Sequence, residues 1–89
     1  LAMRTASRDG TEIHLTPNEW DLLAQLARHP GRVLTHAQLL EAVWGRAHLH
    51  DVEYLRVTAR ALRLKLEEEP SNPRLIRNEP GVGYRLAAQ

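Results

Sequence analysis

The first long apolar pattern of the chain has the spacing of a helix. Trp20, Leu23 and Ala27 recur at i, i+3 and i+7, and Leu22 and Leu26 lie beside them. Together they form a broad apolar stripe. Such a stripe predicts an amphipathic helix with one side against a core.

Two capping boxes mark where helices begin. Residues 16–19, Thr-Pro-Asn-Glu, combine a threonine cap with a glutamate three positions later and a proline at the first helical position, where no N–H is needed. Residues 35–38, Thr-His-Ala-Gln, repeat the motif ahead of a second apolar run. We therefore expect one helix that ends at residues 29–31 and a shorter second helix that ends near Trp44 and Gly45.

A third helix is expected between Asp51, which can cap its start, and Pro70, which stops it. Its core stripe is narrow and consists of apolar residues at i, i+4, i+7 and i+11, namely Leu55, Ala59, Leu62 and Leu66. Residues 46–50, between the second and third helices, show little periodicity and are predicted to form a loop.

Short extended runs flank the helices on both sides. Asp9-Gly10 separates two such runs before the first helix, and this dipeptide favours a tight hairpin turn because both of its residues adopt positive φ. After the third helix, residues 74–77 and 84–86 flank a turn rich in proline and glycine. The predicted fold class is therefore α+β, with a short N-terminal antiparallel sheet, three helices and a C-terminal β-hairpin.

The composition fits one small globular domain. Residues 1–89, with 43% apolar and 26% charged side chains, have room for a single core and none for a separate catalytic domain. No apolar run approaches the roughly 18 residues that span a membrane. The absence of cysteine excludes thiolate zinc sites and favours a reducing cytoplasm. The N-terminus has no signal-peptide pattern and no starting methionine, so we expect a piece of a longer protein.

Charge is concentrated rather than large. The net charge of +1 does not by itself indicate a nucleic-acid partner. The segment from Tyr54 to Leu66, however, carries only basic charges, which are Arg56, Arg60, Arg63 and Lys65. The side of this helix away from the core consists of Tyr54, Val57, Ala61 and Leu64. Small and apolar groups between long cations suit a helix that reads base edges while cations hold phosphates, although a plain solvated face fits the charges equally well.

The neighbouring elements favour the first interpretation. A short helix, a connection and a second helix with a basic face make a helix-turn-helix, and the hairpin that follows can place Arg77, Asn78 or Arg85 beside DNA as a wing. Tyr84 is expected to pack within this hairpin rather than to stack on bases. The connection, residues 45–50, is longer than the three or four residues usual in the motif.

Several motifs in this order resemble one family. They are His14 to Leu23, His29 to Thr35, Gln38 to Leu40, Val43 to Gly45, Leu62 to Glu67 and Gly81 to Leu86. The sequence, almost from end to end, resembles the DNA-binding domain of OmpR/PhoB-type response regulators. The resemblance implies a winged helix-turn-helix that binds double-stranded DNA in the cytoplasm and regulates transcription, with no cofactor, metal or membrane partner.

The same resemblance implies several protein partners. Family members carry a receiver domain that is phosphorylated on aspartate through a sensor kinase, and we expect it to be absent from residues 1–89, together with the first strand of the family's N-terminal sheet. They bind direct repeats as dimers, so a second copy of the chain is an expected partner. Their loop between the second and third helices contacts RNA polymerase, and it corresponds here to Gly45, Arg46, Ala47, His48, Leu49 and His50.

DNA-binding positions follow residue by residue from the resemblance. Those matched in the third helix are Tyr54, Val57, Thr58, Arg60 and Arg63, and those near the second helix are His36 and Trp44. We add Ala61 and Lys65 from the helix and Arg77, Asn78 and Arg85 from the wing, with phosphates held by Arg60, Arg63 and Lys65. Ala61 and Pro80 stand where many members have arginine, so we expect a different sequence preference. An alanine can still contact a thymine methyl group.

Other interpretations have less support in the residues. His48 and His50, with His36, could suggest a metal site, but no carboxylate stands at ligand spacing, and we take them as loop residues. Three glutamates at 67–69 point in different directions and are expected to form a solvated helix end. An enzyme would need a paired nucleophile and base or a glycine-rich phosphate loop. The main alternative to DNA binding is a winged helix that contacts an acidic protein.

Overall fold

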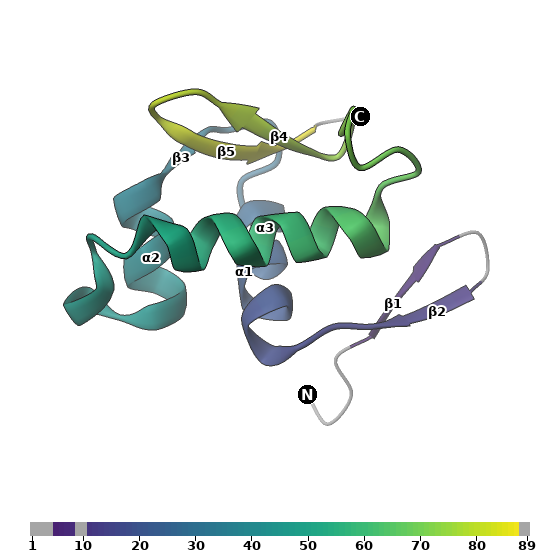
Figure 1. Ribbon diagram of the computed structural model, residues 1–89, viewed down its shortest axis with the longest axis horizontal. Coiled ribbons are helices and arrows are strands. Elements are labelled where there is room, and N and C mark those ends of the chain that lie inside the picture. The colour runs from purple at the N-terminus through teal and green to yellow at the C-terminus, as the bar shows by residue number, and fades with distance from the viewer. Residues whose placement is uncertain (1–4, 9–10, 88–89) are drawn as a thin grey trace.

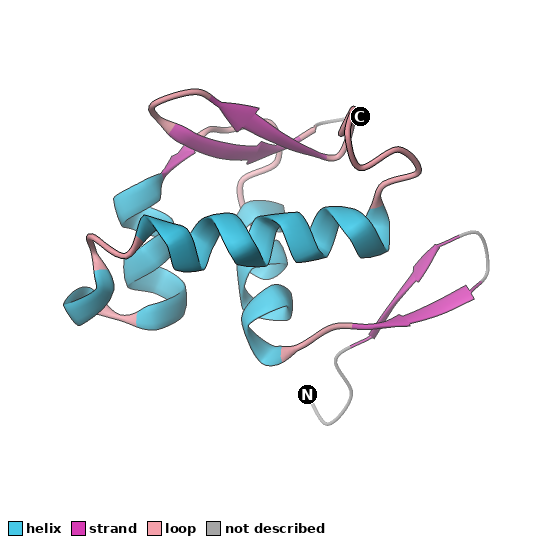
Figure 2. Ribbon diagram, in the orientation of Figure 1, coloured by secondary structure: helices cyan, strands magenta, loops and turns pink. Residues whose placement is uncertain are grey.

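The structure, a computed structural model, describes residues 5–8 and 11–87. Its elements in chain order are β1 (Thr5–Arg8), β2 (Thr11–His14), α1 (Pro17–Ala27), β3 (Leu34–Thr35), α2 (His36–Trp44), the 3₁₀ turn η1 (Arg46–His48), α3 (Val52–Leu66), β4 (Ile76–Glu79) and β5 (Gly83–Leu86). Figure 1 shows α3 across the front of the molecule, with α1 and α2 behind it, one sheet above it and the β1–β2 hairpin below it. Figure 2 marks the same elements by type. Of the helices described, none is long and apolar enough to cross a membrane.

Both predicted capping boxes are present. The Thr16 hydroxyl oxygen accepts the backbone N–H of Glu19 at 3.3 Å, and a Glu19 carboxylate oxygen accepts the N–H of Thr16 at 3.1 Å. Thr35 and Gln38 make the same pair of bonds at 3.1 and 2.9 Å. Each box satisfies N–H groups that a helix leaves unpaired, which fixes the starts of α1 and α2.

The predicted C-terminal hairpin is part of a three-stranded sheet. β5 pairs antiparallel with β4 on one side and with the two residues of β3 on the other. The sequence pattern does not predict β3, because two residues are too few to show an alternation of apolar and polar positions. By pairing with β5, the segment before α2 fixes the hairpin to the helices.

The N-terminal hairpin is confirmed. β1 and β2 pair antiparallel, with Thr5 opposite His14 and Arg8 opposite Thr11. The predicted Asp9-Gly10 turn lies outside the described residues. Figure 1 shows this hairpin on the other side of α3 from the β3–β5–β4 sheet.

The core lies between the helices and the inner side of the three-stranded sheet. Its largest fully buried side chains are Leu22, Leu26, Leu39, Leu40, Leu55, Leu62 and Ile76. The predicted stripe of α3 is confirmed, although Leu66 is only partly buried at its edge. Four residues of the predicted α1 stripe pack on the core, since Leu22 and Leu26 are buried and Trp20 and Leu23 are partly buried. The prediction is wrong at Ala27, which is exposed. Helical spacing alone cannot show that Ala27 lies outside the core, because this depends on where α2 and α3 pack against α1.

Both ends of α3 differ from the sequence prediction. Asp51 occupies the position before the helix but makes no capping bond, and its carboxylate accepts Nδ1 of His48 at 2.8 Å instead. At the other end the helix stops at Leu66, before Pro70 is reached, where Glu67 takes extended backbone angles of φ −83° and ψ 141°.

Glu67 is a buried carboxylate, so the prediction of a solvated helix end is wrong at this residue. Only 4% of Glu67 is exposed. Its two carboxylate oxygens accept the backbone N–H groups of Arg74, Leu75 and Ile76 at distances of 2.8 to 3.1 Å. These charge-assisted bonds offset the cost of burying the carboxylate and order the segment that leads into β4. The two glutamates that follow are exposed, as expected.

Candidate nucleic-acid interface

The outer face of α3 gathers exposed apolar side chains. Among the described residues, the exposed large hydrophobic side chains are Tyr54, Val57, Leu64 and Val82. The first three belong to α3 and lie away from its core stripe. Val57 and Leu64 are 64% and 61% exposed. Exposed apolar groups that share one face are typical of a contact surface, whereas a solvated face would carry polar groups there.

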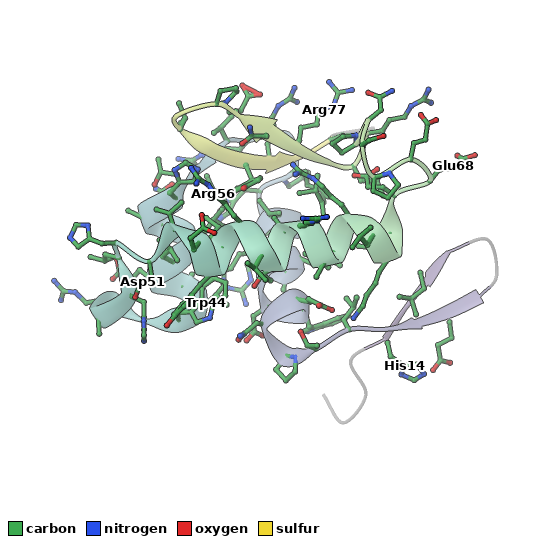
Figure 3. All side chains as sticks on the ribbon, viewed as in Figure 1. His14, Trp44, Asp51, Arg56, Glu68 and Arg77 are labelled. Atoms are coloured by element: carbon green, nitrogen blue, oxygen red, sulfur yellow. The ribbon has the colours of Figure 1, made fainter. Side chains whose placement is uncertain are left out.

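Arginine borders this face on the side of the wing. Arg56 and Arg60 are exposed, and Figure 3 shows Arg56 between α3 and the β4–β5 hairpin. An Arg56 nitrogen lies 3.1 Å from a carboxylate oxygen of Glu53, and both side chains are more than half exposed. Such a pair contributes little to stability, so Arg56 can exchange this carboxylate for another anion. An apolar surface and accessible cations therefore lie side by side.

Lys65 points away from this face, toward α1. Its Nζ donates to a carboxylate oxygen of Glu19, whose side chain is 8% exposed, and to the carbonyl oxygen of His14 at 3.1 Å. Glu19 also belongs to the capping box of α1. Lys65 thereby joins the end of α3 to the start of α1 and to β2.

Arg63 points toward the sheet. Its Nε donates to the Ile76 carbonyl oxygen at 3.0 Å, and its guanidinium carbon lies 5.4 Å from the centre of the Tyr84 ring. Helical spacing places Arg60 and Arg63 on one flank of the outer face and Lys65 on the other. The structure leaves only Arg60 of these three exposed, since the other two are partly buried against their partners.

The other residues of α3 that are predicted to contact DNA differ in how exposed they are. Thr58 is 8% exposed, and its hydroxyl donates to the Tyr54 carbonyl oxygen at 2.8 Å, so its hydrogen-bonding capacity is used within the helix. Ala61 is partly exposed and borders the apolar face. Tyr54 is 48% exposed.

Aromatic side chains gather where α3 begins. The centre of the Tyr54 ring lies 6.2 Å from that of Trp44 and 5.6 Å from that of His48. The two predicted contacts Trp44 and Tyr54 thus meet at one end of the interface, beside residues 45–50. His48 is held by Asp51 as described above, and no group of three metal-ligating side chains occurs within 5–8 and 11–87.

The loop at residues 45–50 is more regular than predicted, because it contains η1. Arg46, Ala47 and His50 are exposed, whereas His48 and Leu49 are partly buried. The loop therefore presents some of its side chains outward from a backbone that η1 and the His48–Asp51 bond hold in place.

The wing turns two arginines away from α3. Ile76 and Tyr84 are buried, so the alternation of side chains along β4 and β5 places Arg77 and Arg85 on the opposite side of the sheet. These two arginines stand across from each other in the strand register, and Arg85 also pairs with Glu79 at 3.3 Å. Figure 3 shows Arg77 at the outer margin of the sheet, away from α3.

The turn of the wing lies against the start of α2. Val82, which is 48% exposed, accepts the backbone N–H of His36 at its carbonyl oxygen, at 3.0 Å. The His36 ring meets the Tyr84 ring edge-on, with 5.9 Å between centres. Tyr84 is 5% exposed and is a packing residue, as expected. Asn78 is exposed.

Three exposed residues beside these surfaces are missing from the predicted DNA-binding set. Arg56 and Leu64 could have been included, because helical spacing alone places them on the outer side of α3. Val82 stands between two glycines in the wing turn, where no periodicity marks an exposed side chain.

Comparisons with other sequences identify a family. Residues 10–86 match the family described as transcriptional regulatory protein, C terminal. The chain is 46% identical over 88 residues to transcriptional regulatory protein KdpE of Mycobacterium tuberculosis H37Rv. This alignment covers 99% of this chain and 39% of that protein. It is 47% identical over 86 residues to the KDP operon transcriptional regulatory protein KdpE of Escherichia coli K12. That alignment covers 97% of this chain and 38% of the relative. The chain thus spans little more than a third of the length of these relatives.

Solved structures agree with the sequence comparisons. The response regulator DrrB of Thermotoga maritima, an OmpR/PhoB homologue, superposes with a TM-score of 0.77 at 32% identity over 89% of this chain and 36% of that one. The DNA-binding domain of RstA from Klebsiella pneumoniae, in complex with the RstA box, gives a TM-score of 0.81 at 27% identity, over 94% of this chain and 83% of that one. The chain therefore belongs to the family of C-terminal domains of transcriptional regulatory proteins and is a winged helix-turn-helix of the OmpR/PhoB type.

Proposed function

We propose that this chain binds double-stranded DNA with sequence preference and regulates transcription as the effector domain of a two-component response regulator. The observation that carries the proposal is the outer face of α3, where Val57 and Leu64 are more than 60% exposed next to exposed arginines. A groove-reading helix needs cations that hold phosphates and shorter groups that meet base edges. The RstA domain, which shares this fold, was solved in complex with the RstA box, and this supports the same use of the fold here.

The residues of α3 divide into two roles. Arg56 and Arg60 hold phosphates at the border of the major groove. Val57 and Ala61 contact base edges, where an apolar group suits the methyl group of thymine. We leave Arg63 and Lys65 out of the phosphate-binding set. The Arg63 side chain is held by the bond from Nε to the Ile76 carbonyl oxygen, and the Lys65 Nζ is bound to Glu19 and to the His14 carbonyl oxygen.

Contacts outside the centre of α3 rest on the resemblance to the family. Trp44 and His36 contact the DNA backbone near α2. Tyr54 and Thr58 face DNA from α3, although the Thr58 hydroxyl is already bonded within the helix. The wing residues Arg77, Asn78 and Arg85 reach phosphates that flank the site. Because Arg77 and Arg85 face away from α3, they do not contact the stretch of groove that α3 occupies.

An electrophoretic mobility shift with fragments of the host genome at physiological salt tests the proposal. A sequence-specific domain binds its sites about a thousandfold more tightly than other DNA, so we expect a few fragments to shift well before the rest. If all fragments shift together, or none shifts, the alternative of a module that contacts an acidic protein gains support.

We further propose that the target genes encode a potassium-transport system. Tyr54-Leu55-Arg56, His14 and Asn72-Pro73-Arg74 resemble the regulator of the Kdp potassium-transport operon, and two relatives that carry this name are 46% and 47% identical to the chain. Nuclease footprinting on the promoter of the host's potassium-transport operon should show protection. If the protected sites lie elsewhere, the target assignment fails and DNA binding stands.

The remaining partners are proposals drawn from the resemblance. In the full-length protein, a receiver domain under the control of a sensor kinase governs this domain in the cytoplasm. A second copy occupies the other half of a direct repeat. Residues 45–50 contact RNA polymerase, and the exposure of Arg46, Ala47 and His50 supports this contact.

A further inference from the structure

Arg63 is the side chain within α3 that hydrogen-bonds to the wing, which also packs on the common core. Its Nε donates to the carbonyl oxygen of Ile76, the first residue of β4, at 3.0 Å. Its guanidinium lies over the ring of Tyr84 in β5, at 5.4 Å from the ring centre. One planar group of α3 thus contacts both strands of the hairpin.

The guanidinium is partly buried at this place. Its Nη2 is buried and has no hydrogen-bond partner among the described residues. A buried nitrogen cannot reach a DNA phosphate unless the side chain leaves its present position, and leaving would break the bond to Ile76 and the contact with Tyr84. The geometry therefore opposes the role of phosphate anchor that the sequence suggests for Arg63.

The contacts of Tyr84 continue toward the start of α2. The Tyr84 ring meets His36 edge-on at 5.9 Å, and Tyr84 pairs with Leu34 of β3 in the strand register. The wing is consequently held on two sides, by β3 with the start of α2 and by Arg63 of α3. The contact through Arg63 sets how the hairpin stands relative to the outer face of α3.

We propose that Arg63 is a positioning residue that fixes the wing against the recognition helix, and that it acts on DNA binding through the wing rather than by contact with DNA. This proposal rests on the proposed function. Only arginine supplies both contacts, since a lysine ammonium has no planar face to lie over a ring and no Nε–H along the stem.

The experiment compares Arg63→Lys with Arg28→Lys, because both substitutions keep the charge and Arg28 lies at the end of α1, outside the proposed DNA interface. Affinity for a site selected from random DNA is measured across a series of salt concentrations. We expect Arg63→Lys to weaken binding about tenfold, as the loss of one hydrogen bond from a charged group would, with an unchanged salt dependence. Arg28→Lys should bind as the wild type does, because Arg28 is exposed at the end of α1 and belongs to no proposed DNA contact. Wild-type affinity in Arg63→Lys, together with a shallower salt dependence in Arg63→Ala, would overturn the proposal.

A second readout does not depend on DNA. Amide hydrogen exchange in residues 76–86 should be faster in Arg63→Lys than in the wild type, and unchanged in Arg28→Lys. If the wild type shows no DNA preference, the proposed function is overturned, but wing exchange still reports on Arg63. This readout therefore separates the two proposals. Unchanged wing exchange in a folded Arg63→Lys protein overturns the positioning role.

If Arg63→Lys does not fold, Tyr84→Leu tests the same contact from the other side, since it leaves the guanidinium intact. The positioning role then requires weaker DNA binding and faster wing exchange. Wild-type binding and wing exchange in this variant would contradict it.

Discussion

At the scale of single residues, the carboxylate of Glu67 holds the segment between α3 and the wing. It accepts three backbone N–H groups in a buried position. Glu67→Gln replaces one accepting oxygen by an NH₂ group that faces those donors, so we expect a loss of about 2–3 kcal/mol in the free energy of unfolding. Urea unfolding followed by circular dichroism measures this free energy in the variant and in the wild type. The exposed neighbour gives the control, because Glu68→Gln should stay within about 0.5 kcal/mol of the wild type. Equal effects of the two substitutions would contradict the assignment.

Gly83 shows a second constraint at this scale. A Cβ at Gly83 would lie 1.8 Å from the Leu34 carbonyl oxygen and 2.9 Å from Cα of Thr35, so β3 and β5 can pair only if this residue is glycine. We expect Gly83→Ala to destabilise the protein by about 3 kcal/mol or more, measured as a lower melting temperature. Gly81, with φ 75° and no atom within 4 Å of an added Cβ, is the matched control. Gly81→Ala should cost about 1–2 kcal/mol, and a larger loss there than at Gly83 would show that crowding is not the cause.

At the scale of elements, the cations of α3 divide between contacts within the chain and the proposed DNA interface. Arg63 contacts the wing and Lys65 contacts α1, which leaves Arg60 to the proposed DNA interface. Arg60→Ala should therefore make the plot of log affinity against log salt shallower by about 0.9, the value for one phosphate. Lys65→Met should leave this slope unchanged and lower the stability, because Glu19 loses its partner. A reduced slope in Lys65→Met would mean that its Nζ leaves Glu19 for a phosphate.

The apolar centre of the same helix predicts what kind of base it meets. If Val57 and Ala61 contact thymine methyl groups, replacing those thymines with deoxyuridine removes the methyl groups and keeps every hydrogen bond of the duplex. Each replacement at a contacted position should weaken binding about fivefold, equivalent to roughly 1 kcal/mol. Replacements outside the contacted positions serve as controls. Equal affinity for the thymine and deoxyuridine sites would exclude methyl contacts from the preference.

At the scale of the whole molecule, the sequence predicts what is determined within a few residues. The capping boxes at Thr16 and Thr35 and the periodicity of α3 fix the order and the starts of helices locally. What could not be predicted depends on segments far apart in the chain. Glu67 accepts bonds from a loop that returns to it, and β3 becomes a strand only because β5 lies beside it.

The candidate site divides in the same way. Helical spacing correctly finds the outer face of α3, because that face depends only on the helix and its core stripe. It cannot show that partners from β4 and from α1 draw Arg63 and Lys65 away from that face. Nor can it show that the strand alternation of the wing turns Arg77 and Arg85 outward, since this follows from the burial of Ile76 and Tyr84.

The measurement that tests the central proposal most directly is a competition between two duplexes of equal length and base composition. One carries the site that the chain selects from random DNA, and the other carries the same bases in shuffled order. At physiological salt, we expect the selected duplex to bind about a thousandfold more tightly. The preference should fall in Val57→Asp, which places a charge at the centre of the outer face of α3. Equal affinity of the wild-type chain for both duplexes would contradict sequence-specific recognition by this face.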